Sequence, residues 1–192
     1  MSHHFYAMLS RMKNIYRWGL MRNTKQENLS EHSLEVAFIA HALAVIKNRR
    51  LGGNVNPAEV AVAAMFHDTT EIITGDMPTP IKYYNPEIRD VYKQIEAVAG
   101  DKLLNMLPED LRDDFKNFYS PDQETKELIK AADKLSALIK CTEELNMGNR
   151  EFEVAKKSTL KAVKDMNLPE AEIFLEEFME SFSLPLDEQG NK

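Results

Sequence analysis

Residues 64–72 read Ala-Met-Phe-His-Asp-Thr-Thr-Glu-Ile, and they set His67, Asp68 and Glu71 in a mostly apolar stretch. Imidazole and carboxylate side chains bind first-row divalent cations, and such a cation can activate water at neutral pH. A carboxylate among apolar residues also needs a partner or a cation to offset the cost of burying it. The stretch therefore predicts a metal-dependent hydrolase whose other ligands lie elsewhere in the chain.

The composition indicates one soluble domain. The chain has 192 residues, 43% of them hydrophobic, which is enough for a single sizeable core. Its net charge of -7 and its pI near 5.3 argue against nucleic-acid polymers and anionic membranes as partners. Cys141 is the only cysteine, which favours a reducing compartment, and no run of about 18 apolar residues occurs. We expect a cytoplasmic protein with one domain over residues 1–185 and a disordered tail over residues 186–192.

Helical periods dominate the sequence, and alternating strand-like patterns are scarce. Gly19 is expected to end the first helix, and Gly100 is a position where the fourth could weaken or break. The pattern predicts an all-α, single-domain helical bundle, with helices over about 5–18, 28–48, 57–73, 86–107, 121–145, 150–165 and 169–182.

Helical phasing relates the polar residues to the apolar stripes. His32 falls on the buried stripe of the second expected helix, and Asp133 lies beside the stripe of the long fifth helix. On a straight third helix, His67 and Glu71 share one face, and Asp68 lies about 100° round from His67. Three separate helices can therefore direct ligands towards one cation.

Other interpretations of these residues stay open. A histidine on an apolar stripe, such as His32, is often a hydrogen-bonded core residue. Asp133 could pair with Lys130 or Lys134 at the surface, and Glu71 could be a solvated glutamate. Arg17 could be an exposed cation at a helix end.

The order His32, His67-Asp68, Asp133 resembles the H…HD…D signature of the HD-domain metal-dependent phosphohydrolases. More closely, the chain is similar to the bacterial HD-domain 5′-deoxynucleotidases, which hydrolyse deoxyribonucleoside 5′-monophosphates to deoxynucleoside and phosphate. The resemblance covers almost the full length and implies a helical bundle of the HD-domain type. The narrower match rests on Arg17-Trp18, residues 20–23, residues 27–33, residues 75–80 and Lys140-Cys141.

The resemblance implies a role for each matching residue. His32, His67, Asp68 and Asp133 would be the metal ligands. Glu71 would be the catalytic carboxylate that positions or activates water, and Arg17 would be catalytic by orienting the phosphate. The substrate would contact a wider set: Arg17, Trp18, Asp68, Asp76, Met77, Pro78, Thr79 and Asp133.

The same resemblance implies a substrate, a cofactor and an assembly state. Trp18 would pack against the sugar and crowd a ribose hydroxyl, which would select deoxyribonucleotides. The cofactor would be a divalent transition metal ion, with Co²⁺ or Mn²⁺ favoured and Fe²⁺ or Zn²⁺ open. The partner would be a small deoxynucleoside monophosphate, and the protein would be a homodimer.

Alternatives within and outside the enzyme class remain. Other HD-domain enzymes act on nucleoside triphosphates, on the alarmone guanosine tetraphosphate or on cyclic dinucleotides. The alarmone group has an acidic residue after the glutamate, where this chain has Ile72, and the Gly-Tyr-Pro signature of the cyclic-dinucleotide group is absent. A non-catalytic helical module that binds nucleotide is the alternative from another class.

Overall fold

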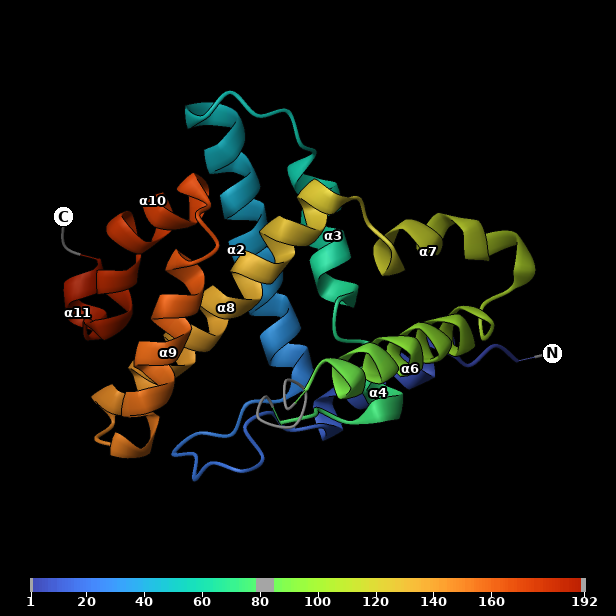
Figure 1. Ribbon diagram of the computed structural model, residues 1–192, viewed down its shortest axis with the longest axis horizontal. Coiled ribbons are helices and arrows are strands. Elements are labelled where there is room, and N and C mark those ends of the chain that lie inside the picture. The colour runs from blue at the N-terminus through green and yellow to red at the C-terminus, as the bar shows by residue number, and fades with distance from the viewer. Residues whose placement is uncertain (1, 79–84, 191–192) are drawn as a thin grey trace.

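All regular elements in the described residues, 2–78 and 85–190, are helices, apart from an isolated antiparallel bridge between Tyr16 and Asn28. The computed structural model in Figure 1 therefore confirms the prediction of an all-α bundle. The α-helices are α1 (Phe5–Leu9), α2 (Leu29–Arg50), α3 (Pro57–Phe66), α4 (Glu71–Thr74), α6 (Pro86–Leu104), α7 (Arg112–Tyr119), α8 (Gln123–Asn146), α9 (Glu153–Lys164), α10 (Pro169–Glu177) and α11 (Leu186–Gln189). The 3-10 helices are η1 (Ser10–Asn14), η2 (Glu109–Leu111), η3 (Arg150–Phe152) and η4 (Met179–Ser183).

Helix α2 lies at the centre of the main core and packs against α3, α8 and α10. The predicted start near Asn28 is confirmed, because the Asn28 side chain accepts from the amides of Ser30 and Glu31, and Glu31 accepts in return from the Asn28 amide. This capping box satisfies amides that the first turn leaves without helical partners. The helix is long and apolar enough to cross a membrane, but 56% of its most apolar window is buried in the bundle. Its apolar character is therefore that of a central core helix.

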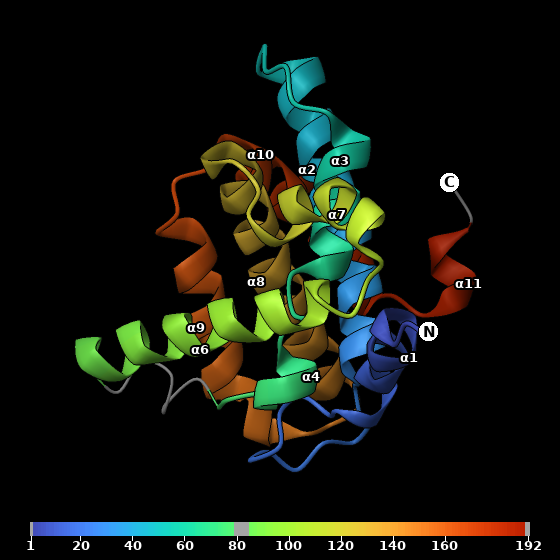
Figure 2. The ribbon, with the colours of Figure 1, turned by 90° about the vertical axis from the view of Figure 1, so that its right-hand side faces the viewer.

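A second, smaller core joins α1, α6 and α7 and contains Phe5 and Leu103. Figure 2 shows α6 crossing the bundle with its N-terminal half extending beyond it. Gly100 does not break this helix, which continues to Leu104. A side chain at this position would meet Tyr119 at 3.3 Å, so the glycine gives the tyrosine ring room to pack. Helix α7, which carries that tyrosine, was not expected from the sequence.

The prediction of one continuous third helix is wrong between His67 and Thr70. Helix α3 ends at Phe66, and α4 begins only at Glu71. The intervening amides bond three residues back, as in Thr69 to Phe66 at 3.2 Å and Glu71 to Asp68 at 3.0 Å. These tight turns replace a straight helix, so the predicted angles between the polar residues do not apply.

The first expected helix is also shorter than predicted. It ends with η1 at Asn14, and Ile15 is extended. Arg17 and Trp18 therefore lie in a loop, not at a helix end. Gly19 was expected to end the helix with a positive φ, but in this loop Trp18 adopts the positive value, 59°, and Gly19 does not.

The C-terminal part largely follows the expected pattern. The two predicted short helices appear as η3 with α9 and as α10 with η4, and α8 starts after the Asp122 cap. Residues Leu186–Gln189, in the segment expected to be disordered, form the short exposed helix α11. The domain boundary at residue 185 stays a prediction.

Candidate metal and nucleotide site

Two neighbouring segments carry the three closest candidate ligands. His32 lies in the first turns of α2 and is fully buried, and His67 and Asp68 directly follow α3. One ligand atom from each of the three residues lies within 4.8 Å of the other two. The structure thus brings His32 to the His67-Asp68 pair, as the sequence predicted.

Hydrogen bonds at Nδ1 fix which nitrogen each histidine presents. His67 Nδ1 lies 2.7 Å from the carbonyl oxygen of Ala64, which can only accept, so Nδ1 carries the hydrogen. His32 Nδ1 lies 3.1 Å from the Ser136 hydroxyl, which donates its own hydrogen to Glu35. His32 Nδ1 is therefore also a donor, and both Nε2 atoms carry lone pairs when the rings are neutral.

Those Nε2 atoms face carboxylate oxygens. His67 Nε2 lies 3.2 Å and His32 Nε2 lies 3.5 Å from the same oxygen of Asp68. Lone pairs at these distances repel unless a proton or a cation lies between them. Burial opposes a charged ring, but Asp68 and Asp133 raise the pKa of His67 to about 9. Two imidazole nitrogens beside carboxylates therefore fit a divalent first-row cation, which would displace that proton.

Asp133, on α8, lies next to His32. Its Oδ1 atom lies 3.1 Å from His32 Nε2, but its carboxylate is outside the group whose atoms all lie within 4.8 Å. Burial raises the pKa of Asp133, but the contact with His32 and the charge of Arg17 lower it overall. Among the described residues, no ion pair joins Asp133 to Lys130 or Lys134, so the surface-pair interpretation is wrong.

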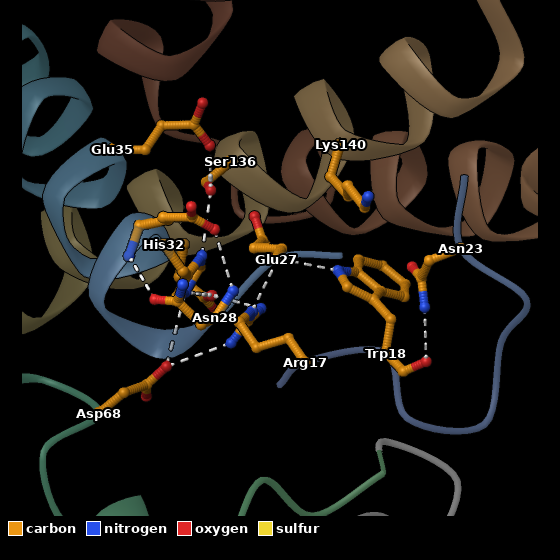
Figure 3. A network of polar contacts seen from close by, with 12 residues as sticks. Arg17, Trp18, Asn23, Glu27, Asn28, His32, Glu35, Asp68, Ser136 and Lys140 are labelled. Atoms are coloured by element: carbon orange, nitrogen blue, oxygen red, sulfur yellow. Dashed lines mark hydrogen bonds and ion pairs between the residues drawn. The ribbon is translucent and has the colours of Figure 1, made fainter. Parts of the chain in front are cut away.

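Arg17 connects this group to a third carboxylate, as Figure 3 shows. Its Nη1 atom lies 3.2 Å from Asp68, its Nη2 atom 3.7 Å from Asp133 and its Nε atom 3.2 Å from Glu27. Burial alone lowers the pKa of Arg17, but the three carboxylates and Asp76 raise it above its ordinary value. The interpretation of Arg17 as an exposed cation at a helix end is wrong, because its side chain is 13% exposed.

Trp18 lies next to Arg17 and is fixed at several points. Its Nε1 atom donates to Glu27 at 3.1 Å, and its carbonyl oxygen accepts from the Asn23 side chain at 3.2 Å. Its ring lies 5.4 Å from the ring of Phe152, centroid to centroid. The only tryptophan of the chain therefore packs beside the candidate site, with its polar atom satisfied.

Glu144, fully buried on α8, anchors the loop that follows Trp18. Its carboxylate accepts from the amides of Thr24 at 2.8 Å and Lys25 at 3.2 Å, and from the side chains of Asn149 at 2.7 Å and Lys140 at 2.5 Å. Burial raises the pKa of Glu144, but these donors lower it to about 2. The carboxylate is thus charged in the interior and ties the loop to α8.

Glu71 follows the candidate ligand Asp68 by three residues in the sequence. It is the first residue of α4, it is 5% exposed, and its amide donates to the carbonyl of Asp68. A solvated glutamate, the alternative from the sequence, is excluded by this burial.

The predicted substrate loop begins where α4 ends, at Gly75 with φ 75°. Asp76, Met77 and Pro78 are partly buried there, and Asp76 is near enough to Arg17 to raise its pKa. Thr79, the fourth residue predicted to line the substrate site, lies outside the described residues.

Three residues of the site were not assigned from the sequence. Glu27 was noted only as part of a matching segment, and Glu35 and Ser136 were not noted at all. Helical spacing contains a usable signal for the last two, because Glu35 follows His32 by three residues and Ser136 follows Asp133 by three. Glu27 has no such signal, because its contacts depend on a non-helical loop.

Two solved structures share the fold of this chain. An HD-domain phosphohydrolase from Listeria innocua superposes with a TM-score of 0.79, at 22% identity over 93% of this chain and 88% of that one. A cyanophage S-2L HD phosphohydrolase, solved with dA and one catalytic Zn²⁺ ion, gives a TM-score of 0.64 at 20% identity, over 91% of this chain and 96% of that one. The chain therefore shares its fold with HD-domain phosphohydrolases.

Relatives with similar sequences identify the family. A 5′-deoxynucleotidase from Vibrio parahaemolyticus is 53% identical over 188 residues, covering 96% of this chain and 97% of the relative. One from Yersinia pestis is 54% identical over 190 residues, covering 96% and 95%. The model of the family described as 5′-deoxynucleotidase YfbR-like matches residues 4–182, and the chain belongs to that family of hydrolases.

Proposed function

We propose that this protein is a metal-dependent 5′-deoxynucleotidase, which converts deoxyribonucleoside 5′-monophosphates to deoxynucleoside and phosphate. The observation that carries the proposal is the pair of histidine Nε2 atoms that face one oxygen of Asp68. We assign His32, His67, Asp68 and Asp133 as the metal ligands. A divalent cation bound there would offset the charge of the phosphate and lower the pKa of a bound water.

The residues around the ligands supply the rest of the chemistry. Arg17 would donate to the phosphate oxygens, because a guanidinium can form two parallel bonds to one phosphate. Glu71 would take the proton of the attacking water as the new bond to phosphorus forms. The bond from phosphorus to O5′ would break, and the leaving oxygen would take a proton from solvent to give the deoxynucleoside hydroxyl. Glu71 would return the proton of the attacking water to solvent, so one water is consumed in each turnover.

Trp18 would set the preference for deoxyribose. Its ring lies beside Arg17, so a sugar attached to the phosphate would lie within reach of the indole. A 2′-hydroxyl packed against this apolar surface would lose its water without gaining a partner, which raises the free energy of ribonucleotide binding. Asp76, Met77, Pro78 and Thr79 would line the remaining part of the substrate site.

The proposal extends to the cofactor, the assembly state and the location. We propose Co²⁺ or Mn²⁺ as the activating ion, because two imidazoles with two carboxylates suit both. The cyanophage phosphohydrolase contains Zn²⁺, so a zinc titration is a necessary comparison. We also propose a cytoplasmic homodimer, which light scattering after size exclusion would test through a mass of twice 22.0 kDa.

One assay tests the proposed function. Metal-stripped protein should release no phosphate, and added Co²⁺ or Mn²⁺ should restore release from dAMP, dUMP and dTMP with little from AMP. Equal rates on deoxy- and ribonucleotides would exclude the proposed selectivity. Activity confined to triphosphates, guanosine tetraphosphate or cyclic dinucleotides would move the protein to another class of HD-domain enzyme, and binding without turnover would make it a nucleotide-binding module.

A further inference from the structure

We infer that Glu27 is a positioning residue that fixes Arg17 and Trp18 relative to each other and so couples phosphate binding to sugar selection. The inference rests on the proposed function. One oxygen of Glu27 accepts from both Arg17 Nε at 3.2 Å and Trp18 Nε1 at 3.1 Å. Figure 3 shows the two side chains meeting at this carboxylate.

The backbone holds Glu27 opposite the residues that it contacts. The Arg17 amide donates to the Glu27 carbonyl at 3.0 Å, beside the antiparallel bridge of Tyr16 and Asn28. Asn28 caps α2 directly after Glu27, so the carboxylate is tied to the start of the core helix that carries His32. A rigid element thus determines where the Glu27 oxygen lies.

The position of Trp18 depends on such a contact. Its φ of 59° is in the left-handed region, which is unfavourable for a bulky side chain and persists only where surrounding contacts impose it. The ring contact with Phe152 and the bond to Glu27 are two such contacts. Without the carboxylate, the indole loses its polar partner and one of the contacts that keep it in this conformation.

The arrangement of charges assigns a positioning role to Glu27. Arg17 lies between Glu27 on one side and the Asp68 and Asp133 carboxylates on the other. Glu27 binds Arg17 through Nε, which leaves the two terminal nitrogens directed towards the metal candidates. The carboxylate therefore sets the direction of the guanidinium and, through the same oxygen, the place of the indole.

The test compares Glu27→Ala and Glu27→Gln with Glu151→Gln as a matched control. Glu151 holds the same loop, because it accepts from the amide and the side chain of Arg22 at 3.1 and 2.6 Å. Its hydrogen bonds to the described residues reach neither Arg17 nor Trp18. Glutamine at position 27 retains an oxygen that can accept both bonds without the charge. Alanine retains neither, so it should show the larger effect.

Two measurements separate positioning from general loss of fold. For Glu27→Ala, kcat/KM on dAMP should fall by about tenfold or more, since bonds to a charged group are lost. The ratio of kcat/KM on dAMP to kcat/KM on AMP should fall as well. Glu27→Gln should recover part of both, and Glu151→Gln should change neither. Because Trp18 is the only tryptophan, its fluorescence reports this residue alone, and acrylamide quenching should increase in Glu27→Ala even without substrate.

The outcomes distinguish the inference from the proposed function. A wild-type protein that does not prefer deoxyribonucleotides would overturn the function, while the quenching result would still report whether Glu27 holds Trp18. A selective wild-type protein whose ratio and quenching are unchanged by Glu27→Ala would overturn the inference alone. Equal changes in Glu151→Gln would also overturn it, because they would indicate loop stability and not positioning.

Discussion

The candidate site has two parts that the chain builds in different ways. His32 and Asp133 come from the long helices α2 and α8, whose apolar faces are packed in the main core. Arg17 and Trp18 come from a loop between η1 and α2, where buried or partly buried carboxylates hold the chain. Core packing thus positions the first part, and charge-assisted hydrogen bonds position the second.

This difference predicts different consequences of mutation. Removing a proposed ligand from α2 or α8, or from the His67-Asp68 turn beside them, should leave the helices folded, because their stability comes from the core. In the loop part, removing an anchoring carboxylate should affect stability or geometry, because no apolar face replaces it. The predictions below separate these two kinds of effect, from the largest to the smallest.

The largest effect is expected for Asp68→Ala. Asp68 contacts His32, His67 and Arg17, so its loss removes a proposed metal ligand and one partner of the arginine. Phosphate release should fall by about ten-thousandfold, because a bound cation supplies several kcal/mol to the transition state. Elemental analysis should show lost metal, and circular dichroism should show an unchanged helix content. Full metal content in this variant would contradict the assignment of Asp68 as a ligand.

Glu71→Ala should affect catalysis without removing the metal. The proposed role is to accept a proton from water, so turnover should fall by about a hundred- to a thousandfold while metal content stays as in the wild type. Metal loss measured on the purified variant would show that Glu71 is a ligand and that the proposed division of roles is wrong.

Glu144→Gln should act on stability and spare the helical part. The pKa of this carboxyl is about 2 in the folded protein and 4.5 ordinarily, so the unfolded chain takes up a proton first as the pH falls. The contribution of the ion to stability is therefore complete above pH 4.5 and is lost towards pH 2. At pH 7 the variant should lose up to about 3 kcal/mol of unfolding free energy.

Urea unfolding across this pH range measures the effect. The wild type should lose unfolding free energy between pH 4.5 and 2, and the variant should show a smaller dependence on pH over the same interval. Identical pH profiles for the two proteins would show that Glu144 does not supply this stability. Metal content at pH 7 should be the same in both.

Glu151→Gln should have the smallest effect of the four. Glu151 holds the same loop as Glu144, but its partner Arg22 has a side chain that is 92% exposed. Water screens such a pair, so the unfolding free energy should change much less than in Glu144→Gln. A loss comparable to that of Glu144→Gln in the same urea assay would show that burial does not separate the two carboxylates.

The two parts also differ in what the sequence could predict. His32 and Asp133 follow helical periods, and their placement on α2 and α8 is confirmed. The turn at residues 67–70 was missed, because helical propensity alone does not show where amides switch to bonds three residues back. Glu27 and Glu144 were missed as anchors, because their partners lie in a loop or more than a hundred residues away, and no local pattern encodes such contacts.

The long-range bonds of the site have a consequence for how the protein folds. Ser136 is 104 residues from His32, and Glu144 is 120 residues from Thr24. Contacts this distant in sequence require large loops to close, which slows folding relative to proteins with local contacts. During synthesis, three of the proposed metal ligands, His32 on α2 and the His67-Asp68 pair, emerge long before the fourth, Asp133 on α8. Metal binding in the newly made chain should therefore be among the last steps of maturation, after the ribosome has released the C-terminal half.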